Sequence, residues 1–221
     1  MTAVVTGTIA AGEIADGLRE RGIVARVLDP APPYSDALAA LDAQQAITGF
    51  IWAADPPAGE PTDIADLPVD EWVRLGQQPL RDFFQWCQAV SELVGTRETG
   101  NSRPARVIAL VPSMALAGSP GLTAWTSAAE GQRSLTKALA RAWGTRGITV
   151  NTIAVPAAVL TGHAGDDPAP LDRPGLQPLS LPALPTLRNE VAGVIGSLLE
   201  PAWSAVTGAT VAVDGGQWMP S

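Results

Sequence analysis

The stretch Met1–Leu28, MTAVVTGTIAAGEIADGLRERGIVARVL, determines the fold class of this protein. Its first apolar run, residues 3–5, has the composition of a short buried strand. Apolar residues within 14–18 then recur at helical spacing, and Gly22 stands where a helix C-terminal glycine is common. Residues 23–28 form a second β-type run. We therefore predict a strand, a helix and a second strand in succession, which is the building unit of a parallel sheet.

The remainder of the chain continues this alternation of strands and helices, with proline-rich segments at 30–33 and 155–185. The pattern predicts a Rossmann-like, doubly wound α/β fold with a mainly parallel sheet of about six strands. At 221 residues and 46% hydrophobic composition, the chain suits a single domain over residues 1–221. Further strands are expected at 49–54, 107–111, 148–154 and 209–213, and further helices at 35–45, 71–94, 127–143 and from Thr186.

The composition argues against several classes of function. A formal net charge of −8 makes a nucleic-acid partner unexpected, because such a partner requires a basic surface. No apolar run reaches the roughly 18 residues of a membrane helix. Cys87 and His163 are the only residues of their kinds, so we expect neither an internal disulfide nor a metal site of the usual zinc-ligand spacing. We expect a cytoplasmic protein without a signal peptide or a membrane partner.

Several segments in the second half of the chain carry specific motifs. They are SPGLTA at 119–124, RGITVNTIA at 146–154, Pro156 with Thr161, Thr207-Gly208, and VDGG at 213–216. In this order the segments resemble the short-chain dehydrogenase/reductase family, with Ala157 in place of a family glycine. The resemblance covers nearly the whole chain. It implies a dinucleotide-binding fold and, in intact members of the family, NAD- or NADP-dependent hydride transfer.

The family's catalytic positions hold other residues in this chain. The family tyrosine, which exchanges a proton with the reacting carbonyl, aligns with Trp125, and the family lysine aligns with Ala129. An indole N–H is a donor that does not titrate usefully, so Trp125 is unsuited to general acid–base catalysis. The family asparagine aligns with Pro79, and the family serine aligns with Ser113 or, without a gap, with Pro112. Ser113 is either a surviving catalytic serine or a turn residue.

The cofactor motifs of the family are altered as well. Gly7 and Gly12 remain from a loop that presents backbone N–H groups to a pyrophosphate, but the loop is about two residues shorter. Glu13 would place an anion at the helix start, which favours the helix dipole and opposes a diphosphate. Trp52 and Asp55 stand within the family's Asn-Asn-Ala-Gly motif and would crowd the cofactor. We therefore expect no cofactor, neither NAD nor NADP.

The segment between the second and third predicted strands is short. Only about 20 residues separate Leu28 from Gly49, where the family accommodates a helix, an edge strand and another helix. We expect that the family's third strand and one helix are deleted. Asp29, at the end of the second strand, either binds ribose hydroxyls, as in NAD-using members, or is a turn residue beside Pro30.

These changes lead to three hypotheses of function. The first is a non-catalytic subunit that stabilises or regulates an active family member in a hetero-oligomer. The second is an enzyme with non-redox chemistry in the old cleft, as in the halohydrin dehalogenases of this family, with His163 or Asp166 as candidate groups. The third is an atypical NAD(P)-dependent oxidoreductase.

The resemblance also implies where a partner would bind. In the family, two long helices of each subunit form a four-helix dimer contact, and here these helices are 71–94 and 127–143. The expected partner is an intact short-chain dehydrogenase/reductase homologue or a second copy of the chain. Seven tryptophans are compatible either with interface anchors or with ordinary core residues.

Overall fold

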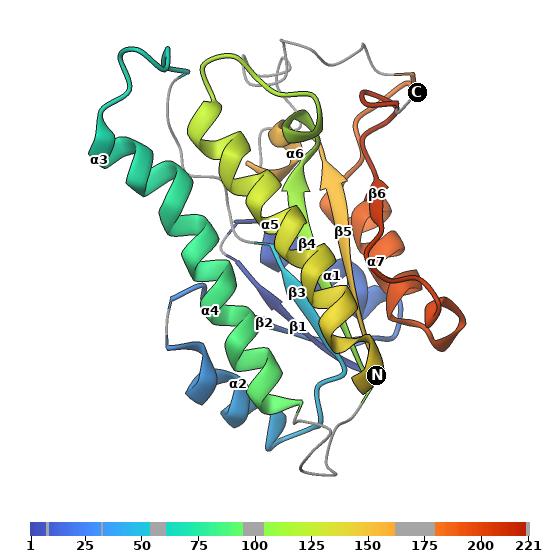
Figure 1. The fold of residues 1–221 in the computed structure, drawn as a ribbon. Coiled ribbons are helices and arrows are strands. Elements are labelled where there is room, and N and C mark those ends of the chain that lie inside the picture. Colours follow the sequence, from blue (N-terminus) through green and yellow to red (C-terminus); the bar gives the residue numbers. More distant parts are fainter. Residues whose placement is uncertain (8, 32, 54–60, 95–103, 162–179, 220–221) are drawn as a thin grey trace.

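The described strands pair into one six-stranded sheet in the order β2-β1-β3-β4-β5-β6, and every neighbouring pair is parallel (Figure 1). The structure is a computed structural model that describes residues 1–7, 9–31, 33–53, 61–94, 104–161 and 180–219. Asp55, His163 and Asp166, which the sequence marked as candidates, lie outside these ranges. The strands are β1 (Thr2–Thr6), β2 (Val24–Leu28), β3 (Gly49–Trp52), β4 (Ala105–Pro112), β5 (Ile148–Val155) and β6 (Thr210–Ala212).

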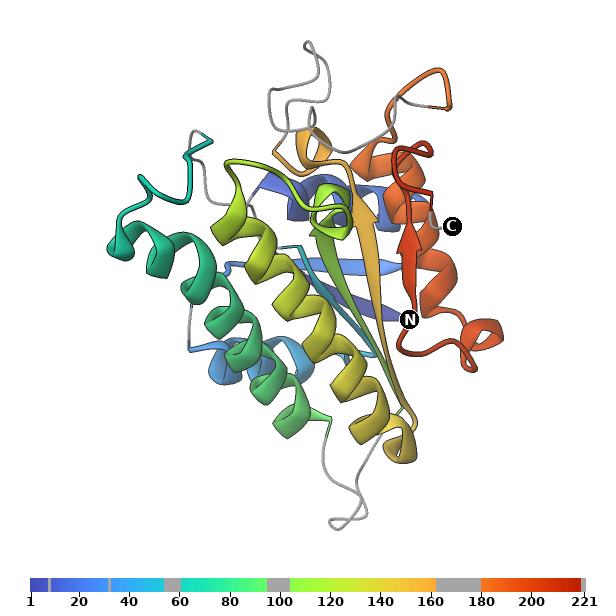
Figure 2. The same ribbon diagram turned by 45° about the horizontal axis from the view of Figure 1, so that its top comes forward.

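Helices cover both faces of this sheet. Figures 1 and 2 show α4 and α5 side by side across one face and α1 with α7 across the other. None of the helices in the described ranges is long and apolar enough to cross a bilayer. The helices are α1 (Ile9–Glu20), α2 (Tyr34–Asp42), α3 (Val69–Trp72), α4 (Gln78–Leu93), α5 (Thr123–Trp143), α6 (Ala157–Leu160) and α7 (Ala192–Leu199).

The sheet separates two apolar cores, and strand β3 contributes to both. Ile51 and Ala53 enter the core beneath α1 and α7, whereas Phe50 and Trp52 enter the core beneath α2 and α4. This division follows from the strand geometry, because successive side chains of a strand point to opposite faces. The alternation therefore fixes which helix layer each residue of the strand can contact.

The connection from β2 to β3 contains one helix, α2, and no strand among its described residues. As a result β2 pairs only with β1 and forms an edge of the sheet. The expected six-stranded, doubly wound sheet is confirmed, and the described chain lacks a strand where the family's third strand would lie.

The two long helices differ in detail from their predicted ranges. The first begins at Val69 and contains a π-helical turn, Val73–Gln77, between α3 and α4. This wide turn ends two residues before Pro79, which lacks the N–H that a regular helix requires. The second helix, α5, begins at Thr123, four residues before the predicted start. Within the segment expected to be irregular, Ala157–Leu160 form the short helix α6.

Candidate functional site

The carboxyl ends of β1 and β3 meet where the strand order reverses, which is the usual ligand position in this type of fold. Here the two strand ends are packed tightly together. The N–H of Ala53 donates to the carbonyl of Thr6 at 2.7 Å. A Cβ atom on Gly7 would lie 2.2 Å from the carbonyl oxygen of Ala53. Packing of the protein's own backbone therefore explains the glycine at position 7, whether or not a diphosphate binds.

Only two residues of the chain separate β1, which ends at Thr6, from α1, which begins at Ile9. Gly12 lies within the helix, and nothing stands within 4 Å of the place where its Cβ would be. Glu13 is exposed and lies beyond the first turn, which contains no acidic residue. The prediction that Glu13 stands at the helix start was wrong, because the helix begins earlier than the glycine spacing suggested.

Trp52 does not face the ligand side of the strand ends. Its indole is 1% exposed and packs in the core beneath α2 and α4. The ring centroid lies 5.6 Å from that of Phe83, 5.5 Å from that of Trp86 and 6.0 Å from that of Tyr34. The expectation that this indole crowds the cofactor was therefore wrong. Trp52 lies on the same face of the sheet as Phe50 and on the opposite face from Ala53.

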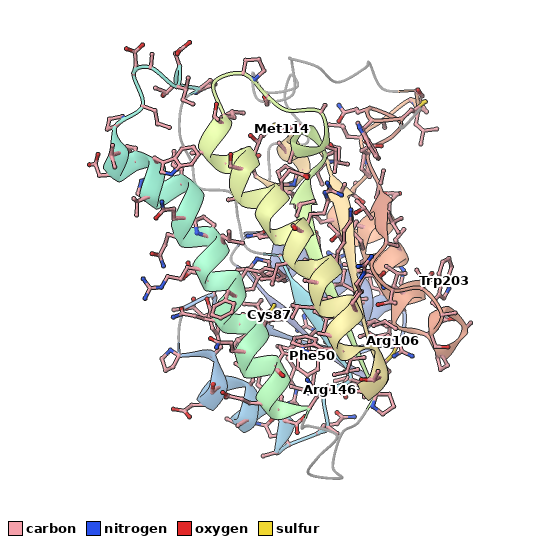
Figure 3. All side chains as sticks on the ribbon, viewed as in Figure 1. Phe50, Cys87, Arg106, Met114, Arg146 and Trp203 are labelled. Atoms are coloured by element: carbon pink, nitrogen blue, oxygen red, sulfur yellow. The ribbon has the colours of Figure 1, made fainter. Side chains whose placement is uncertain are left out.

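The first turns of α5 carry Trp125 and Ala129, the residues at the family's tyrosine and lysine positions. Trp125 is 8% exposed and packs with Met114, Leu122 and Ala157. Figure 3 shows Met114 just beyond the end of β4, beside the start of α5. Ala129 is buried in a second small cluster, whose other members are Val111, Ala115, Ala154 and the partly buried Leu116. Apolar packing thus occupies the position where intact members of the family perform proton transfer.

Ser113 begins a 3-10 turn, Ser113–Leu116, directly after β4. Its side chain is fully buried, and its hydroxyl makes no hydrogen bond to any residue that the structure describes. Pro112 is the last residue of β4 and pairs with Val155. The structure therefore brings Ser113, and not Pro112, to the turn beside Trp125. The Ser113 hydroxyl is thus the one polar side-chain group of the turn Ser113–Leu116, and a buried hydroxyl without a partner typically costs about 1–3 kcal/mol.

Pro79 lies in the first turn of α4, on the side of α5. Its carbonyl accepts a hydrogen bond from the side-chain amide of Gln132 at 3.3 Å, about one turn along α5 from Ala129. Position 79 therefore joins the two helices through its backbone. The aligned positions 79, 113, 125 and 129 gather at one end of the α4/α5 pair, although only Ser113 among them bears a polar side chain.

Asp29 is exposed immediately after β2, at the edge of the sheet. It neighbours Tyr34, whose hydroxyl donates to the carbonyl of Pro30 at 2.7 Å. Burial, and then the charges of Asp82 and Asp29, raise the pKa of Tyr34. This position is compatible with a turn residue and with a ribose ligand, the two interpretations that the sequence left open.

The buried cysteine and the acidic side chains of the described residues do not form a catalytic or metal site. Cys87 is buried in the core beneath α2 and α4, and this burial raises the pKa of its thiol. A thiol with a raised pKa is a poor nucleophile near neutral pH. Within the described ranges, no three His, Cys, Asp or Glu side chains gather as they would around a metal ion.

A groove of about 810 Å³ runs between the outer faces of α4 and α5. The two helices approach closely here, because a Cβ on Gly131 would lie 2.8 Å from Leu80. The sequence signal for this approach was Gly131, a glycine within a helical pattern, which was missing from the predicted site residues. The groove is lined by Trp72, Gly76, Gln77, Leu80, Arg81, Phe84, Ser127, Gly131, Ser134, Leu135 and Ala138.

Part of this chain is similar in sequence to curated reductases. The 3-oxoacyl-[acyl-carrier-protein] reductase FabG of Pseudomonas aeruginosa is 32% identical over 150 residues, which cover 68% of this chain and 58% of that protein. A 3-oxoacyl-[acyl-carrier-protein] reductase of Synechocystis is 31% identical over 156 residues, which cover 69% of this chain and 58% of that protein. The chain thus matches less than two thirds of the length of these relatives.

The fold agrees with solved structures over its whole length. The 3-ketoacyl-(acyl-carrier-protein) reductase of Brucella melitensis superposes with a TM-score of 0.75 at 15% identity, covering 99% of this chain and 98% of that chain. A family model described as enoyl-(acyl carrier protein) reductase matches residues 37–217. On this evidence the chain is a member of the short-chain dehydrogenase/reductase family.

Proposed function

We propose that this chain is a non-catalytic, oxidoreductase-like member of the family that stabilises or regulates an active member in a hetero-oligomer. The observation that carries the proposal is the apolar packing at the two catalytic positions. Trp125 packs with Met114, Leu122 and Ala157, and Ala129 is buried beneath the turn that follows β4. Neither side chain can transfer a proton to a carbonyl or hold a nicotinamide ribose by charge.

Neither the tyrosine nor the lysine of the chain supplies the missing pair of groups. The sequence contains one tyrosine, Tyr34, and one lysine, Lys137. The tyrosine lies on α2, where its hydroxyl donates to the backbone of Pro30. The lysine is exposed on α5, two turns beyond Ala129, where it borders a hollow formed with residues 207 and 208. Both groups are therefore held away from the end of α5 that carries Trp125.

The groove between α4 and α5 supports the assembly part of the proposal. Phe84 lines this groove and is 48% exposed, although its neighbour Phe83 is completely buried. A partner helix pair packed on this groove would remove Phe84 and the neighbouring apolar side chains from water. A specific interface at this surface would bury at least ~1,000 Å² in total.

The relatives' names favour a second candidate function. Several of the curated relatives are reductases of 3-oxoacyl groups carried by acyl carrier protein. An atypical NAD(P)-dependent reductase of such a substrate is therefore the alternative. It requires a dinucleotide to bind at a turn of only two residues between β1 and α1.

Titration calorimetry of the purified chain with NAD and NADP, each oxidised and reduced, separates the two candidates. We expect no measurable binding of any of the four forms, because the shortened turn offers few free N–H groups to a diphosphate. A dissociation constant of about 10 µM or tighter would contradict the non-catalytic proposal and favour the atypical reductase.

A further inference from the structure

The cations of the described chain fall into two groups according to their partners. Most of them are engaged with nearby oxygen atoms. Arg19, Arg74, Arg133 and Arg188 pair with carboxylates, and Arg21, Arg26, Arg106 and Arg146 donate to carbonyl, amide or hydroxyl oxygens. Arg81, Lys137 and Arg141 instead form neither an ion pair nor a side-chain hydrogen bond with any residue of the described ranges.

These three cations border one surface of the molecule. Arg81 lines the groove between α4 and α5. Lys137 and Arg141 line an adjoining hollow of about 610 Å³ between α5 and residues 207 and 208. Ala138 lines both depressions, which therefore adjoin at this residue, and α4 and α5 lie side by side in both ribbon views (Figures 1 and 2). None of the described residues that line the two depressions carries a carboxylate.

Three carboxylates lie near this surface along the two helices. Glu130 binds Arg133, and Glu71 binds Arg74 at 2.6 Å. Asp82, next to Arg81, accepts a hydrogen bond from the side-chain amide of Gln78 at 2.7 Å. The surface is thus apolar in the middle and carries three unpaired positive charges at its border, although the whole chain has a formal net charge of −8. This arrangement calls for opposite charges on whatever covers the groove.

We infer that the occupant of the α4/α5 groove is a protein that presents an apolar helical face bordered by carboxylates, and not a second copy of this chain. The inference rests on the proposed function, which assigns this surface to a partner. A second copy would bring its own Arg81, Lys137 and Arg141 into the same interface. Like charges brought together at an interface oppose association, and opposite charges select the partner and speed its binding.

The test uses the full chain and its own charge-reversed form as the acidic probe. The triple variant Arg81→Glu/Lys137→Glu/Arg141→Glu keeps the apolar groove and replaces its positive border with carboxylates. Sedimentation of the wild type, the variant and their mixture measures the three affinities, after circular dichroism has shown that the variant is folded. The matched control adds Phe84→Ser to the triple variant, which removes an apolar contact at unchanged charge.

We expect the mixture to associate at least about tenfold more tightly than either protein alone in about 50 mM salt. The difference should largely vanish in about 500 mM salt, and Phe84→Ser should weaken the mixed complex. A contrary result would be that the wild type alone associates as tightly as the mixture, with weaker association of the charge-reversed variant. In that case the occupant is a second copy of the chain. This inference would then fail, but the groove would remain an interface. If no combination associates, or if Phe84→Ser has no effect on association, the groove is not an interface and the docking part of the proposed function fails as well.

Discussion

At position 125 an indole stands where intact family members have a phenol, and at position 129 a methyl group stands where they have a lysine side chain. The indole is larger than the phenol that it replaces, and the methyl group is more apolar than the lysine side chain. Neither supplies the polar group that hydride transfer requires at its position. The indole of Trp125 contacts Met114 and Ala157, which follow the ends of β4 and β5. It therefore joins the start of α5 to the carboxyl end of the sheet as a packing residue.

Replacement of Trp125 by alanine should lower the free energy of unfolding by about 3 kcal/mol, because it removes a large and nearly buried side chain and leaves a cavity. Urea denaturation monitored by circular dichroism measures the change. The matched control is Trp203→Ala, since Trp203 is 43% exposed and points away from the body of the molecule (Figure 3). The control should lose less than about 1 kcal/mol. Equal losses for the two variants would contradict a packing role specific to Trp125.

Single residues were the least predictable part of the site. The identities at positions 79, 113, 125 and 129 came directly from the resemblance, and the structure places all four at one end of the α4/α5 pair. The surroundings of Trp52 and Glu13 could not be read in this way. The face of the sheet on which a strand residue lies depends on which residue begins the strand. The distance of a residue from the start of a helix likewise depends on which residue is the first helical one.

At the scale of elements, strand β2 is an edge of the sheet whose outward backbone groups are partly covered by a side chain. In a parallel pair the backbone groups of alternate residues point away from the partner strand, and at β2 these are the groups of Ala25 and Val27. The guanidinium of Arg19, on α1, donates to the carbonyl of Ala25 at 3.0 Å. Arg19 thereby covers one of the acceptors that a third strand would otherwise bind.

Replacement of Arg19 by alanine should increase self-association, because it exposes an acceptor on an edge strand whose Val27 is also 44% exposed. Light scattering during incubation at raised temperature should show a severalfold faster increase than for the wild type. Arg74→Ala is the control, since Arg74 forms the same kind of exposed pair, with Glu71, away from the edge. Equal rates for the two variants would show that Arg19 does not protect the strand.

The helical segment that leads into α7 begins at Thr186, where the sequence also predicted a helix start, and the structure adds a side-chain cap there. The hydroxyl of Thr186 accepts from the N–H of Asn189 at 3.1 Å, and the N–H of Thr186 donates to the carboxylate of Glu190 at 2.7 Å. Thr186→Ala should therefore destabilise the protein by about 1 kcal/mol in urea denaturation. An effect within experimental error would mean that packing alone fixes this helix start.

The same cap predicts a dependence of stability on pH. Hydrogen bonds from the backbone and then from the side chain of Thr186 lower the pKa of Glu190 below its ordinary value of 4.5. Because the folded pKa is the lower one, this contribution is complete above about pH 4.5 and is lost as the pH falls through the folded pKa. Glu190→Gln should reduce the difference in urea midpoint between pH 7 and pH 3, and an unchanged difference would contradict the assignment.

Most elements could be predicted from the sequence, because their apolar residues repeat at the period of a strand or a helix. The absence of a strand between β2 and β3 followed from length alone, since residues 29–48 cannot contain two helices and a strand. The π-helical turn at Val73–Gln77 could not be predicted in this way. It depends on how the helix accommodates Pro79 while packing against α5, which is a property of tertiary contacts.

At the scale of the whole molecule, the described chain keeps the layers of the family fold while the catalytic positions are filled with apolar side chains. The six strands, the paired helices α4 and α5, and the closing strand β6 remain in their expected order. The groove between α4 and α5 became visible only in three dimensions, because it depends on the close approach at Gly131 and Leu80. The proposed hetero-oligomer would therefore form through this surface and not through the strand ends.

The most direct test is the native mass of the complex that an affinity-tagged form of this chain makes in its own host. The account predicts a specific complex with a family member that keeps the tyrosine and lysine, and a loss of that complex on Phe84→Ser but not on Trp203→Ala. Labelling of Lys137, the only lysine in the sequence, should report reduced access in the complex. A chain that is recovered alone and that reduces a 3-oxoacyl thioester with NADPH would contradict the central claim.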